Sequence, residues 1–151
     1  MRIVAQRSLE ASCEVDGKIT GKIDNGLVLL VGFTQTDTKE IVDYMVRKVL
    51  NLRIFDDENG QMNKSVLDVG GSILSVSQFT LYADTKKGNR PSYGYAMSSI
   101  EANNLYNEFN KRLKEFISVE TGIFGADMKV SIMNDGPVTI LLESGNKNDK
   151  K

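Results

Sequence analysis

Two polar segments carry the side chains whose types and spacing could do chemistry. Residues 77–81 read Ser-Gln-Phe-Thr-Leu, and residues 134–139 read Asn-Asp-Gly-Pro-Val-Thr. Both lie at the ends of apolar stretches with strand character, where a packed strand would continue with apolar residues. Hydroxyl and amide groups donate and accept hydrogen bonds, so these segments are the best candidates for a site.

The chain contains no histidine and a single cysteine, Cys13. This composition excludes Ser-His-Asp and Cys-His relays, imidazole acid/base catalysis and histidine-ligated zinc. Cys13 has no disulfide partner and no CxxC spacing, so we interpret it as a structural thiol. Thr80 is a poor nucleophile without a neighbouring base. Any reaction here must therefore run without the common catalytic bases.

Length and composition predict one folded domain. The chain has 151 residues, of which 40% are hydrophobic and 26% charged, typical of a soluble protein with its own core. One free cysteine, no N-terminal apolar segment and no apolar run near the roughly 20 residues of a membrane helix indicate the cytoplasm and no membrane. The net charge of −1 argues against a protein that grips long stretches of phosphate backbone, so we expect no DNA partner.

The first half of the chain predicts sheet structure followed by one helix. Short strands are expected at residues 2–7 and 11–15, a hairpin turn at Asp16-Gly17 leads into a strand at residues 18–23, and residues 27–33 have the pattern of a buried central strand. Asp37 and Glu40 have the spacing of a capping box for a helix that runs to about Leu52.

Residues 56–60 (Asp-Asp-Glu-Asn-Gly) lack the ligand spacing of a calcium loop, so we expect a solvated turn, no metal and no cofactor.

The second half predicts another helix between strands. A strand is expected at residues 72–76, then a polar loop at residues 84–94. Ser98 and Glu101 form a second capping box, and an apolar stripe with helical spacing continues towards Gly122. Two final strands at residues 128–133 and 138–142 flank the second polar segment, and residues 144–151 form a polar, basic tail that we expect to be disordered.

Many of these segments, in this order, resemble the D-aminoacyl-tRNA deacylase family, from Met1 to about Glu143. The matching segments are residues 6–7, 53–55, 62–63, 70–72, 77–81, 83–84, 88–92, 121–122, 126–128 and 134–139. We expect an α/β fold in a single domain of residues 1–143, with a mixed, partly barrel-like β-sheet and two main helices packed on it.

The resemblance implies a cytosolic homodimer that hydrolyses the ester of a D-amino acid, or of glycine mischarged on tRNA(Ala), at the tRNA 3′ end. It implies that the Gly136-Pro137 peptide is cis and enters the partner's active site, that Arg7 braces this loop, and that Met133 also contacts substrate. Ser77, Gln78, Phe79 and Thr80 would form the catalytic pocket for the terminal adenosine and the amino acid. The substrate is then the aminoacylated 3′ end of tRNA.

Several alternatives remain open at this stage. Backbone N–H groups near Phe79 and Thr80 are candidate donors to the developing oxyanion, and the ribose 2′-hydroxyl could assist the attacking water. Thr80 as a covalent nucleophile is the competing mechanism. A protein that binds RNA 3′ ends without turnover, and a small-molecule esterase that uses Thr80, are the competing functions.

Overall fold

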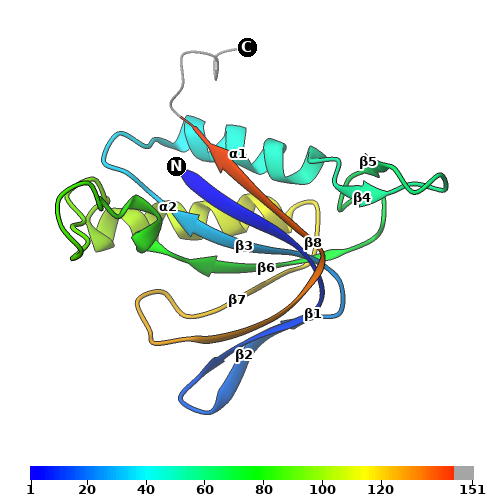
Figure 1. The fold of residues 1–151 in the computed structure, drawn as a ribbon, viewed down its shortest axis with the longest axis horizontal. Coiled ribbons are helices and arrows are strands. Elements are labelled where there is room, and N and C mark those ends of the chain that lie inside the picture. The colour runs from blue at the N-terminus through cyan, green and yellow to red at the C-terminus, as the bar shows by residue number, and fades with distance from the viewer. Residues whose placement is uncertain (145–151) are drawn as a thin grey trace.

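The computed structural model describes residues 1–144 (Figure 1). Its elements in chain order are β1 (Arg2–Val15), β2 (Lys18–Ile23), β3 (Gly26–Gly32), α1 (Lys39–Asn51), β4 (Phe55–Asp56), β5 (Met62–Lys64), β6 (Ser72–Ser77), the 3₁₀ helix η1 (Phe79–Tyr82), α2 (Ser99–Lys114), β7 (Val119–Thr121) and β8 (Lys129–Glu143). The expected α/β fold, a mixed sheet with two main helices in a single domain, is confirmed. No helix of the described part of the chain is long and apolar enough to span a membrane.

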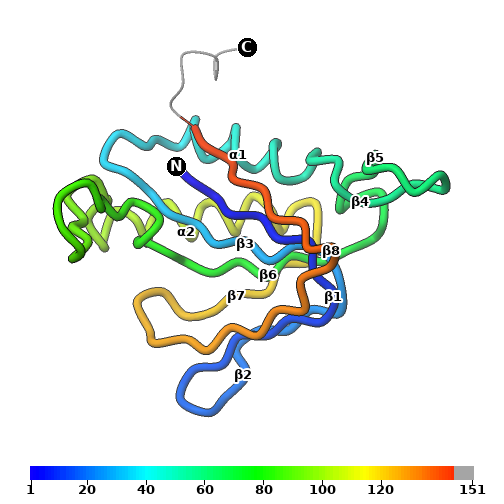
Figure 2. The backbone as a smooth tube through the Cα atoms, viewed as in Figure 1, coloured from blue at the N-terminus to red at the C-terminus, as the bar shows by residue number. Residues whose placement is uncertain are grey.

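The main sheet has the strand order β2-β1-β3-β6-β7, and β8 pairs with β1. Only the β3–β6 and β6–β7 pairs are parallel. The long strand β1 pairs with β3 along its first half and with β2 along its second half, while β8 follows it along both halves (Figure 2). This change of partner curls the sheet, and a Cβ added to Gly21 of β2 would lie 2.8 Å from the Thr121 carbonyl of β7. The sheet is therefore partly closed, like a barrel.

Two apolar clusters hold the fold together. On one face of the sheet, α1 and α2 cover alternate residues of β3, including Leu27, Leu29 and Val31. On the other face, Val28 packs inside the curl of the sheet with the buried thiol of Cys13 and with Leu74. Strand β3 is thus buried on both faces, as its continuous apolar run predicts.

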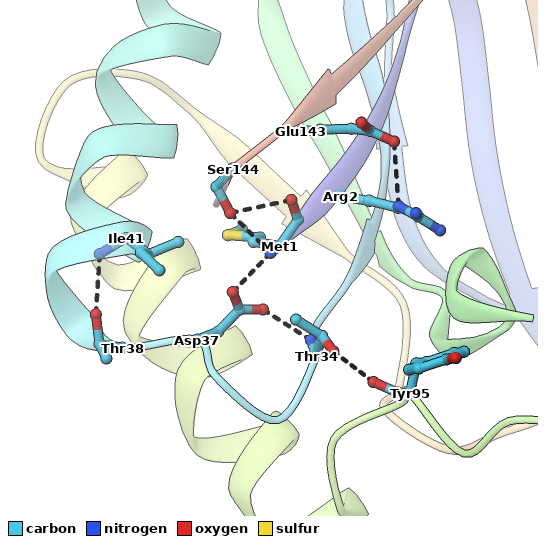
Figure 3. A network of polar contacts seen from close by, with 9 residues as sticks. All are labelled: Met1, Arg2, Thr34, Asp37, Thr38, Ile41, Tyr95, Glu143 and Ser144. Atoms are coloured by element: carbon cyan, nitrogen blue, oxygen red, sulfur yellow. Dashed lines mark hydrogen bonds and ion pairs between the residues drawn. The ribbon is translucent and has the colours of Figure 1, made fainter. Parts of the chain in front are cut away.

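The start of α1 differs from the sequence prediction. The N-cap is Thr38, whose Oγ1 accepts a hydrogen bond from the Ile41 N–H at 3.4 Å, and not Asp37. Asp37 instead accepts from the Thr34 N–H at 2.7 Å and forms an ion pair of 2.6 Å with the buried ammonium group of Met1 (Figure 3). This carboxylate ties the beginning of β1 to the loop before α1.

Helix α2 is shorter than its apolar stripe predicts. Its N-cap is Ser98, but the Ser98 hydroxyl donates to Glu101 at 3.2 Å and caps no backbone N–H. The helix ends at Lys114, and the last part of the stripe leads into β7, which pairs with β6. Pairing in the sheet ends the helical path that periodicity alone would extend to Gly122.

Both expected pairs of short strands are single long strands. Residues 2–15 form β1 without a break, with irregular register near Ser8, and residues 129–143 form β8, which includes the polar segment at 134–139. Residues 57–60 form the largely exposed turn that the sequence predicts, but the short strands β4 and β5 that it joins were not predicted. The expected disordered tail lies outside the described residues except for Ser144, whose hydroxyl accepts from the Met1 ammonium group at 2.7 Å.

Candidate active site

A cavity lies where β3 and β6 end. It has a volume of about 490 Å³. Because these strands are parallel, their carboxyl ends meet at the same edge of the sheet. Its walls comprise Val31, Gly32, Phe33, Val76, Ser77, Gln78, Phe79, Met97, Ser99, Ala102, Phe124, Gly125, Ala126, Met128 and Val130. A mostly apolar cavity with a few polar groups at one rim is typical of a small-molecule site.

Ser77, Gln78 and Phe79 form one rim of this cavity, called the polar rim here because Ser77 and Gln78 supply its polar side chains. The Gln78 N–H donates to the Val31 carbonyl at 2.7 Å, which continues the β3–β6 pairing beyond the last residue of β6. The chain then turns into η1, so that Phe79 stands 58% exposed at the rim. The Gln78 side-chain amide donates to the Thr80 hydroxyl. Thr80 is not among the wall residues, and its hydroxyl is linked to the rim by this bond with Gln78.

None of the wall residues titrates near neutral pH. No hydrogen bond from the Phe79 or Thr80 N–H to another group is found within residues 1–144. Both N–H groups belong to the first turn of a helix, where backbone donors have no intrahelical acceptor. The rim therefore offers free backbone donors next to a cavity without a protein base.

Gly136 and Pro137 form an exposed corner of β8. Their peptide bond is cis, and Gly136 has a φ of +132°. Asn134 holds the corner from inside, because its side-chain carbonyl accepts from the Val138 N–H at 3.1 Å while its amide donates to Gln6 at 2.7 Å. Hydrogen bonds from both sides leave the corner little freedom to rearrange.

Arg7 lies directly behind this corner and is only 8% exposed. Its Nε donates to the Asp135 carbonyl at 3.0 Å, and its Nη1 donates to the Ile54 carbonyl at 2.9 Å. The Asp56 and Asp135 carboxylates lie 3.3 and 3.4 Å from the same guanidinium group. The rigid, planar guanidinium group is suited to join the two backbone segments, since its N–H donors point in fixed directions and reach both at once.

The two sets of site residues predicted from the sequence lie apart within one chain. Arg7 pairs with Leu27 on β3, whereas Ser77 pairs with Val31. Leu27 and Val31 are four residues apart on β3, which corresponds to about 13 Å along the strand. Met133 is exposed on β8, on the side of the Gly136-Pro137 corner and not at the cavity. The corner thus faces solvent and does not enter the cavity of its own chain.

Sequence reasoning missed the wall opposite the polar rim. Phe124, Gly125, Ala126 and Met128 come from the loop between β7 and β8, and Val130 lies in β8. These residue types carry no chemical signal, and their place in the wall depends on how β8 folds back along β1. No group of three or more His, Cys, Asp or Glu side chains that could hold a metal ion occurs within residues 1–144.

The sequence matches the D-Tyr-tRNA(Tyr) deacylase family over residues 4–143. The chain belongs to this family. A solved structure described as "c-Myc DNA Unwinding Element Binding Protein" is 44% identical and superimposes with a TM-score of 0.92, covering 97% of this chain and all of that one. A second, described as "a probable eukaryotic D-amino acid tRNA deacylase", is 17% identical with a TM-score of 0.80, covers 93% of this chain and 97% of that one, and shows the shared fold.

Membership of the deacylase family supports a hydrolase that acts on D-aminoacyl-tRNA. The family match includes the cavity, its polar rim and the Gly136-Pro137 corner. Next to the rim, burial raises the pKa of the Tyr82 phenol well above its usual value, so this group stays neutral. The wall of the cavity itself contains no ionisable side chain.

Proposed function

We propose that this protein is a cytoplasmic proofreading deacylase that cleaves D-aminoacyl-tRNA, and glycyl-tRNA(Ala), in a homodimer. In this dimer the Gly136-Pro137 corner of one protomer enters the cavity of the other. The observation that carries the proposal is the placement of the corner: it is exposed, firmly hydrogen-bonded by Arg7 and Asn134, and remote from its own cavity. A rigid polar corner on the surface is suited to complete a site in a second copy.

Chirality would be selected by the backbone of this corner. Main-chain carbonyls of Gly136 and Pro137 accept hydrogen bonds from the substrate ammonium group, while the corner occupies the space that an L side chain needs. Favourable contacts separate similar small groups by only about 1–3 kcal/mol, whereas a steric clash discriminates more strongly. Glycine has no side chain to clash and would be accepted.

Hydrolysis would depend on positioning and on backbone donors. Water adds to the ester carbonyl carbon, the carbon–oxygen bond to the ribose breaks, and the proton of the water ends on the ribose 3′-oxygen. The free N–H groups of Phe79 and Thr80 stabilise the oxyanion that forms. The ribose 2′-hydroxyl assists the water, since the cavity wall supplies no base. Ser77 and Gln78 orient the substrate.

The decisive experiment compares D-tyrosyl-, glycyl- and L-tyrosyl-tRNA as substrates. The wild type should release D-tyrosine and glycine and spare the L substrate. A Cβ at Gly136 would lie 2.7 Å from the Val138 Cγ2, 2.9 Å from its N and 3.3 Å from the Arg7 guanidinium. Gly136→Ala should therefore distort the corner, displace the acceptors of the substrate ammonium group, and lose both activity towards D-tyrosyl-tRNA and selectivity against the L substrate.

Gly17→Ala is the matched control. Gly17 also has a positive φ, but an added Cβ would meet nothing within 4 Å. Equal cleavage of D- and L-tyrosyl-tRNA by the wild type, or refusal of glycine, would contradict the proposed filter. Tight binding of the RNA 3′ end with no release of amino acid would support the alternative of a binding protein without turnover.

The name of the 44% identical relative refers to DNA binding. The net charge of −1 disfavours a protein that neutralises many phosphates along a duplex. Competition between the tRNA and a DNA duplex of equal length at physiological salt separates these functions. We expect the duplex to leave deacylation unchanged.

A further inference from the structure

A hairpin next to the cavity carries an excess of positive charge. This basic hairpin, residues 84–95, contains Lys86, Lys87 and Arg90, all exposed, and a single carboxylate, Asp84. Within residues 1–144 none of these three cations forms an ion pair. Since the whole chain has a net charge of −1, this is a local concentration of free positive charge.

The backbone of the basic hairpin is held in place although its side chains are exposed. Asp84 and Ser92 exchange two backbone hydrogen bonds of 2.7 and 3.0 Å at its base. The Gln35 amide donates to the Gly94 carbonyl at 3.0 Å, and the Thr34 hydroxyl donates to the Tyr95 carbonyl at 2.5 Å (Figure 3). A ligand would therefore meet a largely preformed surface.

Exposed aromatic rings accompany these cations. Tyr95 is 61% exposed, and Tyr93 packs edge-on against Phe79 of the cavity rim, with ring centroids 5.0 Å apart. A second cavity, of about 300 Å³, is lined by Tyr95 and Lys86 together with Arg2 and Tyr82. Helix η1 separates the two cavities, because Phe79 faces the first and Tyr82 the second. The aromatic surface thus continues from the rim onto the basic hairpin.

We propose that the basic hairpin binds the single-stranded nucleotides that precede the terminal adenosine of the substrate. Lys86, Lys87 and Arg90 pair with their phosphates, and Tyr95 stacks on a base. This inference rests on the proposed function, because it extends the path of the RNA outwards from the same cavity. Free cations beside exposed aromatic rings are the combination that holds single-stranded nucleic acid, whereas bases in a duplex are not free to stack on side chains.

The first test distinguishes binding of the single-stranded nucleotides from binding of the reacting ester. D-tyrosyl-tRNA contains these nucleotides, and 3′-O-D-tyrosyl-adenosine lacks them. For the triple variant K86Q/K87Q/R90Q we expect KM for D-tyrosyl-tRNA to rise at least tenfold with kcat unchanged, and both constants for the adenosine ester to stay as in the wild type.

The matched control is K48Q/K111Q/K114Q, which removes the same charge from exposed helical positions. Lys111 and Lys114 lie 12 and 15 residues beyond the cavity residue Ser99 on α2, about 18 and 22 Å along the helix. A triple variant whose KM for the tRNA matches that of this control would overturn the inference. If the wild type cleaves neither substrate, the proposed function itself has failed.

The second test measures equilibrium binding of RNA hairpins that carry no amino acid. Fluorescence anisotropy follows binding at several salt concentrations. Each contact with a single-stranded phosphate contributes about 0.7 to the slope of log K against log salt. The triple variant should therefore reduce the magnitude of the slope by about 2 for an RNA with a single-stranded 3′ end, and Tyr95→Ala should weaken binding about fivefold or more. Equal effects on a blunt-ended RNA would show that the basic hairpin of the protein binds duplex RNA, and would overturn the inference.

Discussion

Arg7 is the residue on which the geometry of the Gly136-Pro137 corner depends most. It joins the backbone of β8 to the end of the segment before β4 through its bonds to the Asp135 and Ile54 carbonyls. Arg7→Lys keeps the charge but cannot bond both carbonyls at once. We expect the free energy of unfolding to fall by about 1–3 kcal/mol, because a buried carbonyl loses its donor.

Deacylation by the Arg7→Lys variant should fall by a larger factor than its folded fraction does. Amino acid release measures deacylation, and urea unfolding of the same sample measures the folded fraction. Arg47→Lys is the control, since Arg47 pairs with Asp43 on an exposed face of α1, where such pairs contribute little. A variant that unfolds earlier but cleaves normally at 20 °C would show that the corner keeps its shape without Arg7.

Thr80 distinguishes the two mechanisms. Its hydroxyl accepts from the Gln78 amide, and the cavity wall provides no base to activate it. Thr80→Ala retains the backbone N–H groups, so we expect kcat to fall about 10- to 100-fold, far less than the loss of about 10⁶ that follows removal of a covalent nucleophile. Single-turnover kinetics measure this, with Thr20→Ala on β2 as the control. A threonyl ester found in the wild type by mass spectrometry would assign covalent catalysis to Thr80.

At the scale of elements, the cavity depends on the close approach of β3 and η1. A Cβ at Gly32 would lie 2.8 Å from the Gln78 carbonyl and 3.1 Å from the Leu81 Cβ. Gly32→Ala must therefore push η1 away from β3, at a cost of about 1–3 kcal/mol in stability. We expect deacylation to fall at least tenfold in the folded variant. Gly94→Ala, which would place its Cβ in open space, should unfold at the wild-type urea concentration.

The packing of α2 on β6 should make stability sensitive to alkaline pH. The buried Tyr106 hydroxyl donates to the Ser75 carbonyl at 2.8 Å, and burial raises the pKa of this phenol, as it does for Tyr82. In the unfolded chain both phenols ionise near pH 10, so the native state retains protons that the unfolded state has lost. The contribution of these two phenols to the free energy of unfolding should therefore be constant below about pH 9 and fall as pH rises beyond 10. Urea titrations at pH 8 and 11 should show a smaller fall in Y82F/Y106F.

The sequence predicts the elements that local signals define. The Asp16-Gly17 hairpin, the buried strand β3 and the body of α1 were correct, since turn chemistry and apolar periodicity act within a few residues. Periodicity failed where distant pairing decides the structure. The stripe beyond Lys114 keeps its helical spacing, yet Val119 pairs with Ile73 of β6, and no local signal announces this.

The candidate site, too, was predictable only where local sequence signals define it. Ser77 and Gln78 stand out because polar residues end an apolar strand, and the structure places both at a cavity. The roles of Arg7 and Met133 came from the family resemblance alone, because an arginine or methionine within a strand has no distinctive spacing. The wall from Phe124 to Val130 could not be predicted, since it depends on the path of β8.

At the scale of the whole molecule, the exposed corner and the remote cavity give the proposed dimer a specific test. Gly32→Ala damages the cavity and leaves the corner intact, whereas Gly136→Ala does the reverse. When equal amounts of the two variants are unfolded and refolded together, about half of the dimers are hybrids. Each hybrid has one site with an intact cavity and an intact corner from different chains, and one site in which both are damaged.

We therefore expect the refolded mixture to recover about a quarter of the wild-type activity towards D-tyrosyl-tRNA, well above either variant alone. If each chain instead formed a complete site by itself, every site in the mixture would carry one of the two defects, and activity would equal the mean of the two parents. Size-exclusion chromatography on the same samples establishes that dimers have formed. Full activity of the wild type at a dilution where only monomers are present would also contradict the proposal, because a cavity without a partner's corner would lack the acceptors for the substrate ammonium group as well as the wall against L-amino acids.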